Sequence, residues 1–474
     1  MLRTSLWGAR LIHGVGRAQH VPTIMLVRGK RFSILGAGKS GRAVARLLKT
    51  RRAKVFLSEK GKQSKFEDAA RELEEIGVEY EFGDNTHRVL DADYVVLSPG
   101  VPLDAPIVKL AREKQIKILS EIEIAFDECE APVVAITGTN GKTTTTTLVG
   151  EIFKRAGWNT FVAGNIGIAF SEIVDQAKGE KSVVVLEVSS FQLDAIDEFR
   201  PKVSALLNIT PDHLDRYKNY EAYIQSKYRI VENQKGYDIF VYNHDDENVR
   251  NCADTVNIRT LGFSLKEELK QGAFLQGEDV VLRIGREKEV LINKNEIGIP
   301  GPHNLMNAMA AALMTCVMGV EYNAIRETLR TFKGVEHRIE FVRELNGVKY
   351  YNDSKATNVD SVYYALGSFK APIILIAGGK DKGNDYSKIK ELVEQNVKAI
   401  VTVGKGAEKI EKFFDGMKPI HSAGMSMEEA VRLAKEAAAP GDIVLLSPAC
   451  ASFDMFDNYE HRGRVFKELV SQLN

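Results

Sequence analysis

The glycine-rich segment Gly138-Thr139-Asn140-Gly141-Lys142-Thr143 has the residues needed to bind a nucleotide phosphate. It follows the apolar run 132–136 and opens a predicted helix that carries five consecutive threonines. Glycines let backbone N–H groups close around an anion, Lys142 can reach the terminal phosphates, and the Thr143 hydroxyl can bind Mg²⁺. The segment is shorter than the common GxxxxGK[ST] pattern, and a glycine-rich turn with a solvated lysine is the alternative. We predict an ATP or GTP site in which residues 144–147 mainly fill the helix.

A second glycine motif, Gly36-Ala-Gly38-Lys39-Ser40-Gly41, follows the predicted strand 32–35 and precedes a predicted helix. Glu59 lies about twenty residues further on, at the end of the next predicted strand, which satisfies the dinucleotide fingerprint. An NAD-dependent oxidoreductase is therefore one interpretation. Backbone amides at a helix N-terminus bind any diphosphate, including that of a UDP-sugar, and a tight turn needed only for packing has the same pattern. The motif alone leaves the ligand open.

Polar side chains also follow two predicted strands of the middle of the chain, 183–186 and 203–207. Glu187 ends the first strand, and Asp212-His213 follow the second within Asn208-Ile-Thr-Pro-Asp-His-Leu-Asp-Arg-Tyr217. Ligands of nucleotide-binding folds bind at the carboxyl ends of strands, so Glu187 is predicted to hold Mg²⁺ directly or through water. His213 offers a metal ligand or a charge-tuned imidazole. Lys227, in the predicted helix 220–231, has the pattern of a solvated residue.

Composition sets the class of protein in which these motifs lie. A chain of 474 residues is too long for one core, and its 64 basic and 64 acidic residues give no net charge that would favour nucleic acid or membrane as a partner. The four cysteines form no CxxC pair, which favours a reducing cytoplasm. No apolar run approaches the roughly 18 residues of a membrane helix. Residues 1–24 carry three arginines and no acid, as in a transit peptide, but a start-site extension or disorder before Met25 is the simpler prediction.

The hydrophobic pattern predicts three successive α/β blocks, because short apolar runs alternate with longer amphipathic ones. Strands are predicted at 32–35, 54–57, 94–97, 118–119, 132–136, 183–186, 203–207, 239–242, 348–351, 373–376, 399–403 and 443–446. Residues 272–292 break this rhythm with a hairpin-like alternation. The boundaries between blocks are expected near Ser120 and Val335.

Several motifs in a fixed order together resemble the Mur peptide ligase family. They are GTNGKTT at 138–144, GNIG at 164–167, LEVSSFQLD at 186–194, NITPDHLDRY at 208–217, GPHNLMN at 301–307, HR at 337–338, NDSKATN at 352–358 and LSPACASFD at 446–454. The resemblance covers residues 25–474 and is strongest to members that add D-glutamate to UDP-N-acetylmuramoyl-L-alanine. It implies a Rossmann-like domain at 25–120 for the UDP substrate, a P-loop-like ATPase domain at 121–334 and a Rossmann-like domain at 335–474 for the amino acid. Each of these α/β domains is expected to hold a largely parallel sheet with flanking helices.

The resemblance also assigns roles to positions of this chain. Nucleotide contacts are expected from Gly138, Thr139, Asn140, Gly141, Lys142, Thr143, Thr144, Asn304, Asn307, Arg338 and Asp353. Substrate contacts are expected from Gly36, Gly38, Lys39, Ser40, Asn165, Thr357, Lys382, Ser452, Phe453 and Tyr459, the last at a position where the family also has phenylalanine. Thr143, Glu187, His213 and a carbamylated Lys227 are the expected ligands of Mg²⁺, with two ions. Catalysis is expected from Lys142, Glu187, His213 and Lys227.

The resemblance implies ATP-dependent amide formation through an acyl phosphate, completed by closure of the last domain, in the cytoplasmic synthesis of peptidoglycan precursors. A dehydrogenase would leave GTNGKT and the later motifs without a role. A nucleotide-sensing module would not need the intact set of Lys142, Glu187, His213 and Lys227. A Mur-type ligase for another amino acid is the remaining alternative, together with a folylpolyglutamate-type ligase, although the latter enzymes generally lack the GAGKSG-bearing block. We expect a monomer, with no nucleic acid partner and no membrane insertion. Cys450 is expected to be a small buried residue rather than a nucleophile.

Overall fold

The computed structural model describes residues 27–212 and 216–474, which form three β-sheets in two compact units. Unit 1 comprises the described residues up to Glu296 together with Met306–Arg330, and unit 2 comprises Ile297–Leu305 and Thr331–Asn474. The predicted extension at 1–24 lies outside the described residues, and so does His213. Among the described residues, none of the helices combines the length and the apolar character that a bilayer crossing requires.

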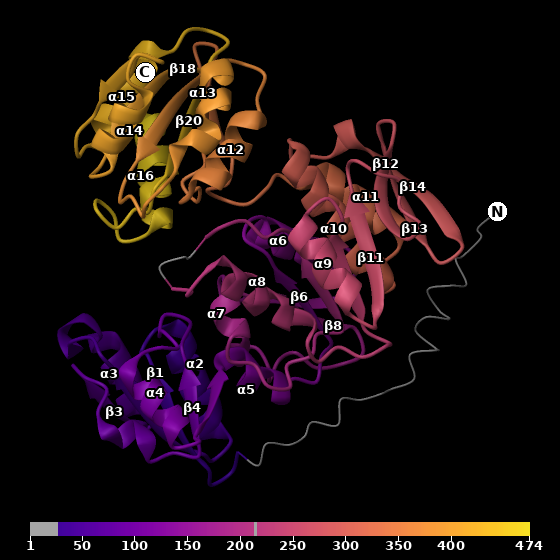
Figure 1. Ribbon diagram of the computed structural model, residues 1–474, viewed down its shortest axis with the longest axis vertical. Helices are drawn as coiled ribbons and strands as arrows, with labels where there is room; N and C mark the ends of the chain where they lie inside the picture. Colours follow the sequence, from indigo (N-terminus) through magenta and orange to yellow (C-terminus); the bar gives the residue numbers. More distant parts are fainter. Residues whose placement is uncertain (1–26, 213–215) are drawn as a thin grey trace. The chain divides into compact units, whose positions relative to one another are not determined.

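The first sheet of unit 1, in which Figure 1 labels β1, β3 and β4, has five parallel strands in the order β3-β2-β1-β4-β5. Its elements are β1 (Arg31–Leu35), α2 (Lys39–Thr50), β2 (Lys54–Glu59), η1 (Gln63–Lys65), α3 (Glu67–Glu75), β3 (Glu79–Phe82), η2 (His87–Leu90), β4 (Tyr94–Leu97), α4 (Pro106–Glu113), β5 (Lys117–Ser120) and α5 (Glu121–Asp127). The chain crosses to one side of β1 to form β2 and to the other side to form β4. The loop that follows β1 therefore lies where the strand order reverses, which is where ligands of such sheets bind.

The second sheet of unit 1 has nine strands in the order β14-β13-β12-β11-β10-β9-β6-β8-β7. Its elements are β6 (Val133–Thr137), α6 (Lys142–Arg155), β7 (Asn159–Gly164), η3 (Phe170–Glu172), β8 (Ser182–Glu187), α7 (Ser190–Leu193), β9 (Val203–Leu206), α8 (Tyr220–Tyr228), η4 (Arg229–Val231), β10 (Ile239–Asn243), α9 (Glu247–Thr255), β11 (Arg259–Ser264), β12 (Gly272–Gln276), β13 (Asp279–Ile284), β14 (Glu287–Asn293), η5 (Lys294–Glu296), α10 (Pro302–Val317) and α11 (Tyr322–Thr331). Every residue of β6 and β8 is buried, which explains their unbroken apolar runs. The hairpin-like pattern at 272–292 corresponds to the antiparallel strands β12, β13 and β14, as predicted.

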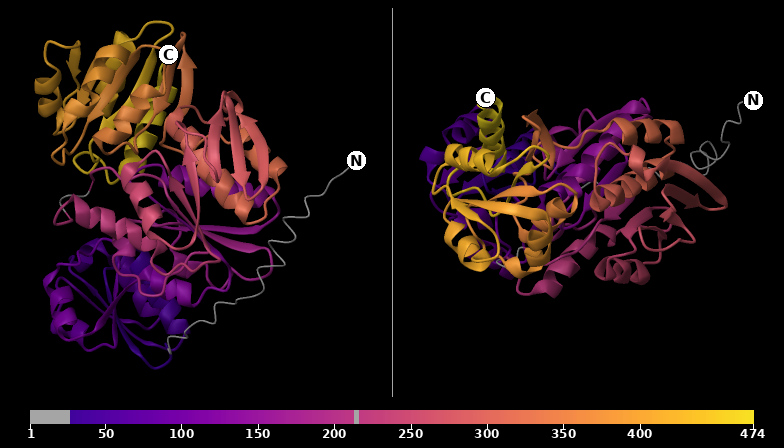
Figure 2. Two further views of the ribbon diagram at one scale, coloured as in Figure 1. Left: turned by 45° about the vertical axis from the view of Figure 1, so that its right-hand side comes forward. Right: turned by 90° about the horizontal axis from the view of Figure 1, so that it is seen from above.

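Unit 2 holds a six-stranded sheet in the order β15-β16-β20-β17-β18-β19, parallel except for the β15–β16 pair. Its elements are β15 (Glu340–Leu345), β16 (Val348–Asn352), α12 (Val359–Gly367), β17 (Ile373–Gly378), η6 (Tyr386–Ile389), α13 (Lys390–Asn396), β18 (Val397–Val403), α14 (Ala407–Phe414), β19 (Ile420–Ser422), α15 (Met427–Ala437), β20 (Ile443–Ala449) and α16 (Tyr459–Gln472). Successive side chains of β17 alternate between two apolar cores, one shared with α12, α13 and α14 and the other with α15 and α16. Helices thus cover both faces of the sheet (Figure 2), as continuous apolar strands require.

The predicted fold class, an α/β chain with largely parallel sheets and flanking helices, is confirmed. The structure adds five strands that the pattern did not predict, β3, β7, β11, β15 and β19. Four of them, β3, β7, β15 and β19, are edge strands whose side chains, apart from Ala163, are exposed or half-buried, so they lack a strong apolar signature. The predicted helix 220–231 was wrong at its end, because the α-helix stops at Tyr228 and the last residues form the 3₁₀ turn η4. The predicted boundaries between the three domains, near Ser120 and Val335, stay predictions.

Candidate active site

Three adjacent strands of the second sheet deliver the predicted phosphate-site residues to one edge. β6 lies between β8 and β9, and all three are parallel, so their carboxyl ends meet. The loop Gly138–Gly141 follows β6, Glu187 is the last residue of β8, and Asn208 follows β9 two residues after its end. Residues far apart in the sequence are thereby brought together at the loop that the motif predicts to bind phosphate.

Asn208 holds the phosphate loop by pairing with its backbone. Its side-chain oxygen accepts a hydrogen bond from the N–H of Asn140 at 2.8 Å, and its amide nitrogen donates to the Asn140 carbonyl at 3.0 Å. The neighbouring Thr139 donates its N–H to the Asn208 carbonyl, and its hydroxyl lies 3.1 Å from the hydroxyl of buried Tyr223. The loop is therefore fixed in shape by protein contacts, as an anion-binding loop must be if it is to receive phosphate without rearranging.

Position 141 requires glycine for two reasons, its backbone conformation and the lack of space for a side chain. Its φ of +84° lies in the left-handed region, and it caps helix α6 without any side chain. A Cβ at this position would lie 2.5 Å from the side-chain oxygen of Asn307, on α10. The glycine thus allows Asn307, one of the two predicted nucleotide contacts on α10, to approach the phosphate loop. Asn304, the other predicted contact, lies one turn earlier on α10 and donates to the Pro300 carbonyl at 2.7 Å.

Two lysine side chains converge on one carbonyl of the phosphate loop. Lys142 Nζ lies 2.8 Å and Lys227 Nζ 2.9 Å from the carbonyl oxygen of Gly138. Lys227 was expected on a solvated face, but its side chain is only 1% exposed and lies over the Tyr223 ring. Burial, and then the positive charge of Lys142, hold the pKa of Lys227 well below its usual range. A buried amine of this kind is neutral at a lower pH than an ordinary lysine.

A chain of hydrogen bonds links the phosphate loop to buried Glu187 and exposed Asn165. The Thr143 hydroxyl donates to one carboxylate oxygen of Glu187 at 2.8 Å, and the Asn165 amide donates to the other at 2.9 Å. Glu187 is buried, and its carbonyl also accepts the Asn165 N–H. A hydroxyl and a carboxylate at the end of a phosphate loop are oxygen donors of the kind that Mg²⁺ takes. The residues present therefore fit a magnesium site, with Thr144 buried behind them on α6.

The first glycine motif forms a tight loop between β1 and α2. Gly36 has φ +100°, and a Cβ on Gly41 would lie 1.9 Å from the Gly36 carbonyl oxygen, so the strand and the helix meet without side chains between them. Glu59 accepts hydrogen bonds from the N–H groups of Ala37 at 2.9 Å and Gly61 at 2.7 Å. The acid of the fingerprint thus braces the glycine loop itself. Gly38 and Lys39 are exposed and Ser40 is half-buried at the start of α2, where a diphosphate would meet the helix N-terminus.

The predicted amino-acid contacts of unit 2 lie on loops that follow three adjacent strands. Thr357 follows β16, Lys382 follows β17, and Ser452 and Phe453 follow β20, the strand between the other two. Tyr459 opens helix α16, with its ring 5.1 Å from the Lys355 ammonium. Ser452 is buried, whereas Phe453 is 67% exposed, an unusual position for a large apolar ring. The structure therefore groups these residues at one edge of the sheet.

Asp353 and Arg338, both predicted to reach the nucleotide, lie beside the same edge. Asp353 is buried and accepts from the Ser447 hydroxyl at 2.8 Å and from the Ile339 N–H at 3.3 Å. Burial raises the pKa of the Asp353 carboxyl to about 7, against the opposing effects of Ser447 and the nearby Arg338 charge. Arg338 Nε is buried and has no hydrogen-bond partner within the described parts of the chain. Both side chains thus have polar atoms that can hydrogen-bond to a bound ligand.

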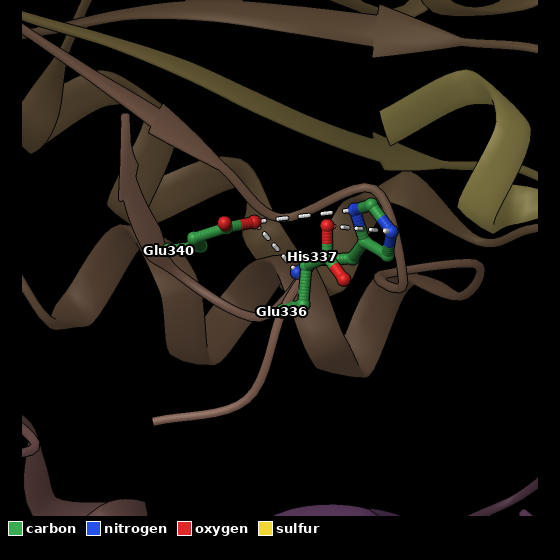
Figure 3. Close-up of side chains that lie close together, drawn as sticks. All are labelled: Glu336, His337 and Glu340. Carbon is green, nitrogen blue, oxygen red and sulfur yellow. Dashed lines mark hydrogen bonds and ion pairs between the residues drawn. The ribbon is translucent and has the colours of Figure 1, made fainter. Parts of the chain in front are cut away.

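Glu336, His337 and Glu340 cluster at the start of β15 (Figure 3), close enough together to suggest a metal site. The Lys467 ammonium, however, lies 2.7 Å from Glu336 and 2.8 Å from Glu340 and forms an ion pair with each carboxylate. The His337 Nδ1 is 2.8 Å from the side-chain nitrogen of Asn352, and burial lowers the pKa of the ring. The cluster is thus an ion-paired and hydrogen-bonded network, in which Glu340 also accepts the N–H of His337 at a turn where His337 has φ +66°.

Two structurally central residues were missed by sequence reasoning. Glu123 accepts hydrogen bonds from the N–H groups of Asp197, Glu198 and Phe199, which ties α5 to the loop after α7. Arg462 is buried under the loops that follow the strands of unit 2. Charged residues on amphipathic helices are normally exposed, so nothing in the local pattern distinguishes either from a surface residue. Cys450 is buried as predicted, and burial raises the pKa of its thiol.

Comparison with known proteins identifies the family. Three family models match the chain: the MurD N-terminal domain at residues 31–107, the Mur ligase middle domain at 136–315 and the Mur ligase glutamate ligase domain at 337–450. The chain belongs to the Mur ligase family. Members of this family are ATP-dependent amide ligases, so the predicted enzyme class and the family resemblance are confirmed.

Full-length relatives support the same family assignment. The UDP-N-acetylmuramoylalanine--D-glutamate ligase of Salinibacter ruber is 50% identical over 457 residues, which cover 94% of this chain and 99% of the relative. The enzyme of the same name from Thermoanaerobacter sp. strain X514 is 44% identical, covering 95% and 100%. Among solved structures, a pseudomurein peptide ligase type C from Methanothermus fervidus has a TM-score of 0.60 at 20% identity, covering 94% of this chain and all of that one. At this identity the structural likeness supports the fold alone.

Proposed function

We propose that this chain joins D-glutamate to the alanine carboxyl group of UDP-N-acetylmuramoyl-L-alanine with the energy of ATP. This amide bond is formed during the synthesis of peptidoglycan precursors, which contributes to cell-wall growth, cell shape and cell division. The observation that carries the proposal is the grouping of Lys142, Thr143, Glu187 and Lys227 around one phosphate loop. The match of residues 31–107 to the MurD N-terminal domain favours this substrate over those of folylpolyglutamate-type ligases.

The chemistry begins with activation of a carboxylate, which does not react with an amine at neutral pH. The terminal phosphoryl group of ATP moves to an oxygen of the alanine carboxylate and gives an acyl phosphate and ADP. The neutral amine of D-glutamate then attacks the acyl carbon, and the tetrahedral intermediate expels inorganic phosphate as the amide forms. The Lys142 ammonium donates hydrogen bonds to the carbonyls of Gly138 and Thr139. When ATP binds, the ammonium turns from these carbonyls to the phosphate oxygens, because they carry more negative charge.

The residues proposed to hold Mg²⁺ are Thr143, Glu187, His213 and a modified Lys227. When bound, the ions would neutralise charge on the phosphates during transfer. The Thr143–Glu187 pair, with its 2.8 Å hydrogen bond, supplies the oxygen donors at the phosphate loop. In this proposal Asn165 orients the carboxylate of Glu187 by donating to the oxygen that Thr143 does not bond. Asn165 also contacts the muramoyl substrate. A pair of ions is proposed.

Lys227 is proposed to carry a carbamate. Its neutral amine adds to carbon dioxide, forming an N–C bond and releasing one proton, and the product is an anion. This change would convert a neutral amine beside the Lys142 ammonium into an anion that can ligate metal. The burial of Lys227 and its lowered pKa support the proposal, because only the neutral amine reacts.

Substrate roles are proposed for the remaining groups in the three predicted domains. Residues 25–120 bind the UDP moiety at the glycine loop, through the N–H groups of residues 36–41. Residues 121–334 bind ATP through the phosphate loop, Asn304 and Asn307. Residues 335–474 bind D-glutamate through Thr357, Lys382, Ser452, Phe453 and Tyr459 and reach ATP with Arg338 and Asp353. Closure of the last domain on the bound substrates would then complete the reacting site.

Purified protein with ATP, Mg²⁺ and UDP-N-acetylmuramoyl-L-alanine provides the test. Phosphate release is expected with D-glutamate, and only background release with L-glutamate, L-lysine or D-alanine. Turnover with one of the other amino acids but not with D-glutamate would refute the proposed substrate. Protection of the first glycine loop by UDP, without any NADH fluorescence change, would separate this function from a dehydrogenase.

We also propose that the enzyme acts as a monomer in the cytoplasm. The four cysteines are all free thiols in the structure, as a reducing compartment requires. Light scattering at micromolar concentration is expected to give the mass of one chain, and a dimer mass would refute the monomer.

A further inference from the structure

Arg462 lies on helix α16 and has the largest fully buried side chain of the described residues. Only 2% of its surface is exposed. Burial lowers the pKa of its guanidinium group to about 10, so the group remains a cation at neutral pH. Burying a cation is costly, and a protein keeps one only where its hydrogen bonds or its charge are used.

Arg462 connects the loop after β16 with the loop after β20. Its Nε donates to the Ser354 hydroxyl at 3.0 Å and its Nη2 donates to the Ser354 carbonyl at 2.8 Å. Its Nη1 donates to the Cys450 carbonyl at 3.1 Å. The acceptors are thus backbone carbonyls and a hydroxyl rather than a carboxylate. Such bonds hold backbone in place, and the planar fork of arginine fixes their directions.

The same network extends to the third loop and to the start of α16. The Ser354 hydroxyl donates to the Tyr459 carbonyl at 2.8 Å. Lys380 and Ala451 exchange two backbone hydrogen bonds of 2.8 and 3.1 Å, which ties the loop after β17 to the loop after β20. Gly379 makes room for this packing, because a Cβ there would lie 3.2 Å from Arg462 Nη1. We call these three loops, residues 353–358, 379–385 and 450–458, the loop cluster.

We infer that Arg462 is a positioning residue for the amino-acid substrate, which sets the spacing of the loop cluster without touching the substrate itself. The inference rests on the proposed function, because the loop cluster carries Thr357, Lys382, Ser452 and Phe453. Arg462 bonds to Cys450, two positions from Ser452, and to Ser354, three positions from Thr357. Since an ångström of misplacement can cost about 100-fold in rate, the arginine should matter for D-glutamate far more than for ATP.

The test compares Arg462→Lys with Arg464→Lys, an exposed arginine two residues further along the same helix. Lysine keeps the charge but has no planar fork, so it cannot bond both loops in the same directions. For Arg462→Lys we expect kcat/KM for D-glutamate to fall about 100-fold, with KM for ATP and for the UDP substrate within about threefold of wild type. Arg464→Lys is expected to match wild type. Guanidinium ion should partly restore Arg462→Ala, which a general loss of folding would not allow.

Amide hydrogen exchange measures the loop cluster directly and does not depend on which amino acid is the substrate. In Arg462→Lys the segments 353–358 and 450–458 should exchange faster, while the strands of the same sheet keep their protection. Ser354→Ala, which removes only the shared hydroxyl, should change the same segments to a smaller degree and serves if Arg462→Lys does not fold. Unchanged exchange in these segments would overturn the inference. So would a loss of kcat/KM that is equal for all three substrates and parallels the loss of folded protein. If wild type does not use D-glutamate, the proposed function fails, and the exchange data still decide whether Arg462 positions the loops.

Discussion

The phosphate loop of unit 1 and the loop cluster of unit 2 are both built where parallel strands end, yet they are constructed differently. The phosphate loop is one contiguous segment, 138–143, braced by Asn208 and joined to Glu187 through Thr143. The loop cluster combines three separate segments between residues 353 and 458, and a buried arginine connects two of them. A contiguous motif carries its own geometry, whereas a composite site depends on residues that never meet the substrate. Variants of the first region should impair chemistry, and variants of the second should impair recognition of the amino acid.

The largest effect is expected from Lys142→Met. Removal of the ammonium that faces the phosphate loop should lower kcat on the order of 1,000-fold, because the transferred phosphoryl group loses a fixed positive charge. Lys154→Met, at an exposed ion pair on the same helix, should leave kcat unchanged. The measurement is steady-state phosphate release at saturating substrates. An activity of Lys142→Met within tenfold of wild type would contradict the role of the loop.

A smaller but still large loss is expected from Lys227→Ala, about 100-fold in kcat, because the carbamate anion is lost. Short carboxylates such as acetate should restore part of the activity, and wild type given carbon-13 bicarbonate should show a carbamate signal that the variant lacks. The lowered pKa of Lys227 gives the sign of the pH dependence: acidification protonates the amine and reduces the carbamate. Lys235→Ala, an exposed lysine of the same unit, is the control. Full activity of Lys227→Ala would contradict a catalytic role for the carbamate.

In unit 2, Asp353→Asn should change how stability depends on pH. The folded-state pKa is raised from 3.8 to about 7, so the carboxyl contributes stability that is fully present below pH 3.8 and is lost as pH rises through 7. Wild type should therefore lose about 1.4 kcal/mol per pH unit between pH 5 and 7 relative to Asp353→Asn. Urea denaturation at pH 5, 6 and 7 measures this difference, with Asp415→Asn as an exposed control. Parallel pH profiles for wild type and Asp353→Asn would show that the carboxyl is not perturbed.

The smallest effect is expected from Tyr459→Phe, less than about threefold in kcat/KM for D-glutamate. The ring and its position above the Lys355 ammonium are retained, and a cation–π contact needs only the ring face. Tyr459→Ala should cost more than Tyr459→Phe because it removes that ring. Equal losses in the two variants would assign the role to the hydroxyl instead. Kinetics with D-glutamate as the varied substrate distinguish the two results.

The same contrast explains what could be predicted from the sequence. The phosphate loop, Glu187 and the buried central strands were predictable because a local pattern determines each of them. Lys227 and Arg462 were not predictable from local physics, because a charged residue on a helix is normally exposed and only the tertiary structure buries it. Lys227 was found through family resemblance, and Arg462 only through the structure. The role of Glu59 also needed the structure, since its position fits a ribose contact but its carboxylate binds the N–H groups of Ala37 and Gly61.

The central claim, that ATP activates the alanine carboxyl group before D-glutamate attacks it, has a direct test with oxygen-18. UDP-N-acetylmuramoyl-L-alanine labelled in that carboxylate is incubated with the enzyme, ATP, Mg²⁺ and D-glutamate, and the released phosphate is analysed by mass spectrometry. An acyl phosphate passes one carboxylate oxygen to phosphate, so each phosphate released should carry a single label, in step with amide formation. Unlabelled phosphate accompanied by amide product would contradict the account, because the carboxyl oxygen would then have left by another route.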